Sequence, residues 1–166
     1  MDYEKFLEGT GRDDKGRTIE EILRWEGSPF RLEFGHDYIQ RLFPLTEPSK
    51  ADRTVRPVTK EELGRIRRNG TAKKNVGRAY TMMLRFWELD GEKYKDASLS
   101  RHWVKRSGKN HNMLRISRVL RCLKLLGMDE YDDFAGRVGY LIALSEKGEF
   151  PLSDKTKTVW KDILSE

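Results

Sequence analysis

The sequence lacks disulfide-forming cysteine pairs, long apolar runs and a signal peptide, and each absence excludes a class of protein. It contains a single cysteine, Cys122, so no intramolecular disulfide can form and the chain is not a disulfide-stabilised scaffold. Its longest continuous apolar run, Tyr140–Leu144, is far shorter than the roughly 20 residues that span a bilayer. The first residues carry neither the basic flank nor the apolar core of a signal peptide. We therefore expect no transmembrane segment and a cytoplasmic location.

The chain also lacks the pattern of a β-strand, an internal repeat or a low-complexity tract. No segment combines sustained apolar–polar alternation with β-branched enrichment. Apolar residues recur instead at spacings of three and four, most clearly in the central segment 110–127, where Met113, Ile116, Leu120 and Leu123 form one stripe. We predict an all-α, single-domain helical bundle over residues 1–166, with about six to eight helices and no significant sheet.

Helix-start and helix-stop signals divide this domain. Capping boxes at Thr18–Glu21 and Thr59–Glu62 predict two helix starts. Gly127 supplies the positive φ expected just after the central helix. Residues 1–17 are interpreted as an irregular lead-in and residues 46–57 as a surface loop. Further helices are predicted near 37–43, 76–89, 99–107, 130–147 and 153–164.

Positive charge is concentrated in the middle of the chain. Residues 1–52 have a net charge of −4, residues 53–124 of +14, and residues 125–166 of −4. Such a region could bind a polyanion, with an aromatic side chain stacking on a base, or could pair with the acidic ends of the fold. The polyanion-binding candidates are Arg65, Arg67, Arg68, Lys73, Lys74, Trp103, Lys105, Arg106, Arg121 and Lys124. Both interpretations stay open.

The sequence offers no set of residues typical of catalysis or metal binding. His36, His102, His111 and Cys122 include no pair at the spacing that places two ligands on one helix face. Cys122 lies in an apolar segment, where a buried and inert thiol is expected. The carboxylates of residues 129–133 fall at a helix start, where they suit the helix dipole. We predict no enzymatic activity and no cofactor or metal.

Three stretches together resemble the conserved N-terminal domain of the opioid growth factor receptor family. They are FLEGTGRDDKGRT at Phe6–Thr18, HDYIQRLFPL at His36–Leu45 and NHNMLRISRVLRCLKLLG at Asn110–Gly127, with support from MLRFWEL at Met83–Leu89. The resemblance covers nearly the whole chain. The family pattern usually has an aromatic residue where this chain has Arg41, and a glycine where it has Glu88.

The resemblance implies a helical, non-enzymatic binding domain. For the animal members it implies a receptor for the pentapeptide Met-enkephalin, associated with the nucleus. A ligand site in this chain is expected at polar residues inside the apolar family motifs: His36, Asp37, Tyr38, Gln40, His111, Asn112, Arg115 and Arg118. The alternative is that His111 and Asn112 cap one helix and His36 and Asp37 begin another. The partner is expected to be a peptide or protein, with nucleic acid as the alternative, and no oligomeric state is predicted.

Overall fold

The computed structural model describes residues 1–95 and 111–166, and the described residues are helical with no strand. They form nine α-helices and one 3₁₀ turn: α1 (Tyr3–Glu8), α2 (Ile19–Leu23), α3 (Pro29–Phe34), α4 (Ile39–Leu42), α5 (Lys60–Arg68), α6 (Gly70–Phe86), η1 (Lys93–Lys95), α8 (His111–Leu126), α9 (Glu130–Glu146) and α10 (Asp154–Ser165). The predicted all-α fold is confirmed. The number exceeds six to eight because the short helices α1 and α3 were not predicted. The helix predicted at 99–107 lies outside the described residues.

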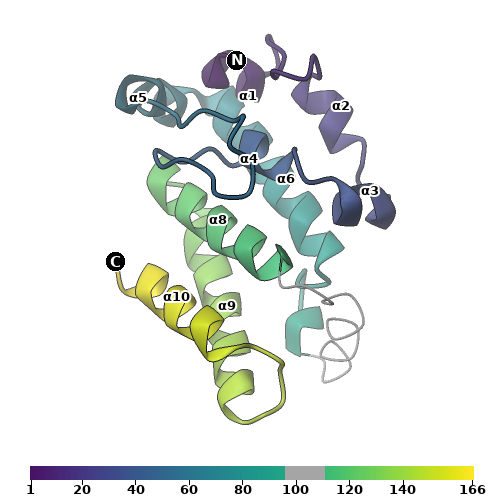
Figure 1. Ribbon diagram of the computed structural model, residues 1–166, viewed down its shortest axis with the longest axis vertical. Helices are drawn as coiled ribbons and strands as arrows, with labels where there is room; N and C mark the ends of the chain where they lie inside the picture. The colour runs from purple at the N-terminus through teal and green to yellow at the C-terminus, as the bar shows by residue number, and fades with distance from the viewer. Residues whose placement is uncertain (96–110) are drawn as a thin grey trace.

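Two groups of helices meet along α6, which crosses the middle of the molecule (Figure 1). Helices α1, α2 and α5 pack around α6, and α8, α9 and α10 pack against one another. Helix α5 also contacts α8. Between α6 and α9, the ring of Phe134 stacks on Trp87 and meets the edge of Tyr80. The buried residues of both groups belong to one continuous core.

The predicted caps set the helix ends. In each capping box the threonine oxygen accepts from a backbone N–H and the glutamate carboxylate accepts from the threonine N–H, at Thr18–Glu21 and at Thr59–Glu62. Gly127 has φ +60°, as predicted after the central helix. Pro29 occupies the first turn of α3, a position where its missing N–H costs nothing.

Residues 1–17 are not wholly irregular, so that prediction was wrong. Asp2 accepts from the N–H of Lys5 and caps α1, whose Phe6 and Leu7 are fully buried. The available signal was the capping residue Asp2. The helix that follows has only six residues, too few for its apolar face to repeat. Residues 46–57 contain no helix, and Ser49 and Val55 within them are buried.

Arg41 connects these two segments to α4. Its side chain is fully buried, and its guanidinium lies 2.5 Å from Asp14 Oδ1 and 3.0 Å from Asp52 Oδ2. It also donates to the backbone carbonyl of Asp37. A buried guanidinium needs such partners because an unpaired charge in the interior is costly. Arg41 therefore holds the N-terminal segment and residues 46–57 against the same helix.

Candidate functional site

Arg115 is a structural centre of the predicted ligand site. Its side chain, only 5% exposed, reaches from α8 to the end of α3. One guanidinium nitrogen donates to the backbone carbonyl of Leu32 at 2.7 Å. The other donates to the backbone carbonyls of Glu33 at 3.2 Å and Gly35 at 2.6 Å. The last carbonyls of a helix have no partner within it. Arg115 thus supplies donors that complete the C-terminal end of α3.

Polar side chains gather around this contact. Asn112 donates to Glu33 Oε2 at 3.1 Å, and its oxygen accepts from Trp87 Nε1 and from Arg115 at 3.3 Å each. His111 Nε2 lies 2.8 Å from Glu33 Oε1. The ring of His36 meets the ring of His111 edge-on, with the centroids 5.9 Å apart. The structure therefore brings His36, His111, Asn112 and Arg115 together from two distant family motifs.

The described part of α8 begins at His111, next to residues outside the described ranges, so the capping alternative for His111 and Asn112 stays a prediction. The expected helix start at His36 and Asp37 is wrong. Helix α4 begins at Ile39, after Tyr38, whose side chain makes no capping hydrogen bond. His36 and Asp37 instead form part of the turn between α3 and α4. Gly35 is required in this turn, since a Cβ there would lie 2.7 Å from the carbonyl oxygen of Arg31.

The other four predicted residues lie behind or beside this group. Tyr38 is fully buried, donates to the carbonyl of Leu32 at 2.8 Å and lies under the guanidinium of Arg115; burial raises its pKa above the ordinary value. Arg118 donates to the carbonyl of Phe43 at 3.0 Å. Asp37 accepts from Arg17 at 3.1 Å. Gln40 is buried, and its Oε1 has no hydrogen-bond partner among the described residues.

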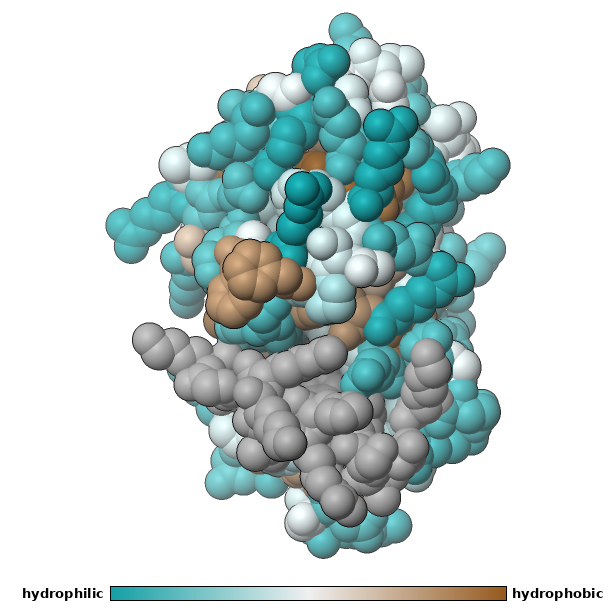
Figure 2. All heavy atoms as spheres, turned by 90° about the vertical axis from the view of Figure 1, so that its right-hand side faces the viewer, coloured by the Kyte–Doolittle hydropathy of each residue, from teal (hydrophilic) through white to brown (hydrophobic). Residues whose placement is uncertain are grey.

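Sequence reasoning missed an exposed apolar group on α3. The side chains of Phe30 and Phe34 are 73% and 62% exposed, and their rings lie 4.7 Å apart. Leu114, one turn after His111 on α8, is 68% exposed. Figure 2 views the side of the molecule on which α3 lies and shows an apolar group standing out of a largely polar surface. Two aromatic residues four apart after Pro29 were the available signal.

The described polyanion-binding candidates differ in their partners. Arg65 pairs with Glu4 at 2.8 Å. Arg67 donates to the carbonyl of Leu125 at 2.7 Å and Lys73 to that of Gly127 at 3.0 Å, so both complete the end of α8. Lys74 and Arg68 are exposed. Trp103, Lys105 and Arg106 lie outside the described residues.

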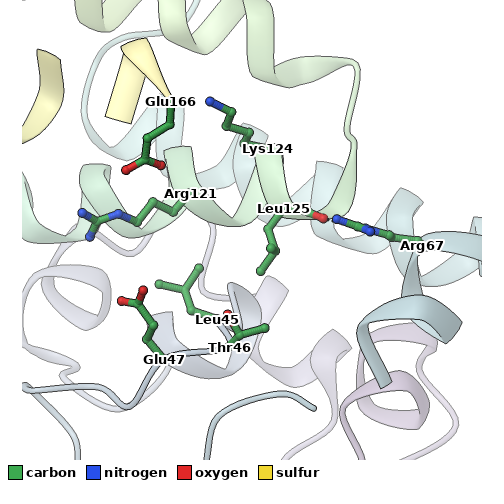
Figure 3. A pocket seen from close by; sticks show the side chains of 8 residues that line it. All are labelled: Leu45, Thr46, Glu47, Arg67, Arg121, Lys124, Leu125 and Glu166. Atoms are coloured by element: carbon green, nitrogen blue, oxygen red, sulfur yellow. The ribbon is translucent and has the colours of Figure 1, made fainter. Parts of the chain in front are cut away.

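Arg121 and Lys124, the remaining basic candidates, line a hollow of about 370 Å³ together with Arg67 (Figure 3). The rest of its lining is Leu45, Thr46, Glu47, Leu125 and Glu166. The hollow lies at the C-terminal half of α8, away from the contacts of Arg115 at the other end of that helix. The two predicted sites are therefore separate regions of the molecule.

The described residues give no positive sign of a metal centre or an activated nucleophile. Within ranges 1–95 and 111–166, no group of three or more His, Cys, Asp or Glu side chains is arranged to hold a metal ion. Cys122 is completely buried, and burial raises the pKa of its thiol to about 12. A thiol with so high a pKa is a poor nucleophile at neutral pH. No helix in the described part is both long and apolar enough to cross a membrane.

The fold is an all-α domain. Its buried polar contacts join the motif that begins at His36 to helix α8, next to the end of α3. The model of the opioid growth factor receptor conserved region matches residues 5–145, and the chain belongs to this family. It is 32% identical over 123 residues to the opioid growth factor receptor of Mus musculus and 33% identical over 123 residues to that of Homo sapiens. It is 34% identical over 122 residues to opioid growth factor receptor-like protein 1 of Xenopus tropicalis.

These alignments cover 70% of this chain but only 19%, 18% and 24% of the three relatives, respectively. The matched region thus corresponds to about a fifth of each relative. No solved structure matches the chain significantly. The relatives are named as receptors and not as enzymes.

Proposed function

We propose that this chain is a non-enzymatic domain that binds a peptide, either free or as a segment of a protein. Two observations support the proposal. The relatives are named receptors for an opioid growth factor or receptor-like proteins. The exposed aromatic pair on α3 is the single structural observation that carries it, since large apolar side chains at this exposure on a polar surface mark interaction sites.

The proposed binding surface consists of Phe30, Phe34, His36, His111 and Leu114, and is called the α3–α8 face. Its polar support is rigid, because Arg115 and Asn112 fix the end of α3 against α8 through buried hydrogen bonds. A surface that is ordered before binding loses less conformational entropy when the ligand arrives. Of the eight site residues expected from the sequence, His36 and His111 would contact ligand directly, and Arg115 and Asn112 would position the face.

The chemistry of the face favours a ligand with an aromatic side chain and a free amino group. An aromatic ring can pack on Phe30 and Phe34 in offset or edge-on geometry. The carboxylates of Glu33 and Asp37 lie beside the face, and the side chain of Asp37 is 39% exposed. A peptide amine would share these carboxylates with the partners that they already have, Arg17 for Asp37 and His111 for Glu33. Short peptides of the enkephalin type combine both features, so Met-enkephalin is the natural first probe.

The experiment is fluorescence anisotropy with Met-enkephalin labelled at its carboxyl end, so that the amine stays free. The variant Phe30→Ser/Phe34→Ser removes exposed side chains and is expected to weaken binding at least about tenfold, as for anchor residues of an interface. Tyr140→Ser is the control, because Tyr140 is a partly exposed aromatic residue on α9, away from the face. The unfolding midpoint of the double variant should stay near that of the wild type.

Two outcomes would reject the α3–α8 face as the ligand site. One is unchanged peptide affinity in the double variant. The other is equal loss in the double variant and in Tyr140→Ser. A labelled single-stranded oligonucleotide, measured at about 50 and 200 mM salt, examines the alternative function. Binding that falls steeply with salt would favour it, although the basic candidates are divided between ion pairs, helix caps and the hollow.

A further inference from the structure

The hollow at the C-terminal half of α8 is lined by two basic side chains of that helix, Arg121 and Lys124, and the Lys124 amine also lies 5.6 Å from the centroid of the Tyr131 ring. Arg121 and Lys124 are half-buried, yet neither forms an ion pair with a described residue. Arg121 also makes no hydrogen bond in the described part of the chain. Other half-buried arginines differ: Arg17 binds Asp13 and Asp37, and Arg118 binds a carbonyl. A partly desolvated cation without a partner is costly, which singles out this position.

The positive charge of Arg121 affects the neighbouring side chain of Arg118. The pKa of Arg118 is lowered, first because the side chain is buried and further by the positive charge of Arg121. Arg118 is committed to the carbonyl of Phe43 and remains close to the second guanidinium on the next turn of α8. An anion bound at Arg121 would relieve this repulsion. Among residues 1–95 and 111–166, no carboxylate forms a hydrogen bond or ion pair with Arg121.

Three cations line the hollow, and in Figure 3 their charged groups point in different directions: Arg121 to the left, Lys124 upward, and Arg67 at the right beyond Leu125. In Figure 3, Arg121 and Lys124 extend from α8, Arg67 approaches from α5, and Leu45, Thr46 and Glu47 line the opposite wall. The Nε of Arg67 is held by the carbonyl of Leu125, which fixes its guanidinium at the rim while leaving its terminal nitrogens as donors. Thr46 adds a hydroxyl group. Leu45 and Leu125 are apolar and lower the local dielectric, which strengthens charge interactions.

We propose that this hollow is a binding site for a single phosphate group, with Arg121 and Lys124 as its principal ligands and Arg67 at its rim. Arginine suits this role because its planar fork matches two phosphate oxygens at once. The site is separate from the α3–α8 face and does not depend on the proposed peptide binding.

The lining argues against an extended nucleic acid as the ligand. Glu47 and Glu166 also face the hollow and would repel neighbouring phosphates of a strand. The adjacent cations Arg65 and Lys73 are engaged by Glu4 and by the carbonyl of Gly127. A strand needs a basic track that follows its backbone, whereas this hollow of about 370 Å³ is local and has the size of a small-molecule pocket. The phosphate can come from a free small molecule or from a phosphorylated side chain of a peptide.

The test is a titration of the full chain with inorganic phosphate at constant ionic strength, followed by nuclear magnetic resonance of arginine Nε–H groups and backbone amides. Sodium chloride replaces phosphate in the reference series. We expect saturable shifts at α8 and residues 45–47 with phosphate and not with chloride. Absence of such shifts up to about 10 mM phosphate, beyond the millimolar range of weak sites, would overturn the proposal.

Matched variants distinguish phosphate binding in the hollow from binding to surface charge elsewhere on the chain. Arg121→Gln and Lys124→Gln should each weaken phosphate binding about fivefold to tenfold, in line with the loss of one charge-assisted contact. Glu47→Gln should strengthen binding about twofold to fivefold, because it removes a competing negative charge. Arg68→Gln is the control, since Arg68 is exposed on α5 and does not line the hollow. Equal loss in Arg68→Gln and Arg121→Gln would overturn the site.

The source of the phosphate is decided by two further ligands. A phosphoserine peptide that binds more tightly than both inorganic phosphate and its unphosphorylated form would identify a peptide-borne group. Equal affinity for the phosphoserine peptide and for inorganic phosphate would identify a small-molecule site. Both of these results would support a single-phosphate site. A single-stranded oligonucleotide that binds more tightly than both, with a steep salt dependence, would replace the single-phosphate site by a polyanion surface.

Discussion

The two halves of α8 carry the same kind of residue in the same spacing and use it differently. Arg115 and Arg118 in the first half donate to backbone carbonyls at the ends of α3 and α4. Arg121 and Lys124 in the second half line a hollow and have no carboxylate partner among the described residues. Spacing by three turns each successive residue back by about 60° around the helix. The first pair therefore meets packed segments, and the second pair meets open volume.

The role of a basic residue in a helix thus depends on which segment packs against its turn, and not on how many basic residues the helix has. The first half of α8 contributes stability and positions a surface, whereas the second half remains free to bind. The same distinction applies to Arg41, whose buried guanidinium faces carboxylates instead of carbonyls. These differences can be measured as changes in stability and in binding.

The largest effect is expected at Arg41. Arg41→Met leaves Asp14 and Asp52 without their buried partner, so the free energy of unfolding should fall by about 3–5 kcal/mol. The triple variant Arg41→Met/Asp14→Asn/Asp52→Asn removes the unpaired charges and should recover part of that loss. Urea denaturation followed by circular dichroism measures both. A single variant as stable as the wild type would show that the ion cluster does not hold the two segments to α4.

The two halves of α8 are compared directly by Arg115→Met and Arg121→Met. The first leaves the carbonyls of Glu33 and Gly35 without this donor, and that of Leu32 with only Tyr38, and should lower the free energy of unfolding by about 2–4 kcal/mol. The second removes no described hydrogen bond and should change it by less than about 0.5 kcal/mol. Equal losses in the two variants, measured by urea denaturation, would remove the distinction between the two halves.

Acid should destabilise the carboxylate pairs but not the carbonyl contacts of α8. Glu62 binds Arg56 and the N–H of Thr59, and these contacts lower its pKa from 4.5 to about 2. Its stabilising contribution is therefore present above pH 4.5 and is lost as the pH falls toward 2. Because Arg56 is 45% exposed and screened by solvent, we expect a contribution of about 1–2 kcal/mol. In Glu62→Gln this part of the pH dependence should be absent between pH 5 and 2.5, as followed by thermal unfolding; an unchanged slope would contradict it.

The sequence was sufficient for the long helices and their caps, because apolar periodicity and capping residues act locally. The all-α class, both capping boxes and the positive φ of Gly127 were predicted correctly. Helices α1 and α3 were missed since six residues are too few to show a repeating apolar face. A short helix owes its stability to the tertiary contacts around it.

The candidate site could be predicted only in part. The family motifs pointed to His36, His111, Asn112 and Arg115, which the fold brings together. Nothing local showed that Arg115 would donate to carbonyls 80 or more residues away, or that Glu33 would lie between the two motifs. The exposure of Phe30 and Phe34 depends on which side of α3 packs inward, and periodicity over six residues does not determine this.

The smallest effect concerns two helix ends with the same backbone conformation and different residues. Gly127 follows α8 with φ +60°, and Glu88 follows the end of α6 with φ +57°; Glu88 is the described non-glycine residue with positive φ. The left-handed region costs a residue with a Cβ about 1–2 kcal/mol more than it costs glycine.

The variant Glu88→Gly should therefore be more stable than Glu88→Ala, which is its matched comparison. Both variants lose the same side-chain contacts, so their difference isolates the backbone term. We expect Glu88→Gly to exceed Glu88→Ala by about 1 kcal/mol in the free energy of unfolding. Gly127→Ala should cost a similar amount, because a Cβ at Gly127 meets nothing within 4 Å and only the backbone strain remains. If urea denaturation gave the two Glu88 variants equal stability, the positive φ would not be an energetic constraint at this helix end.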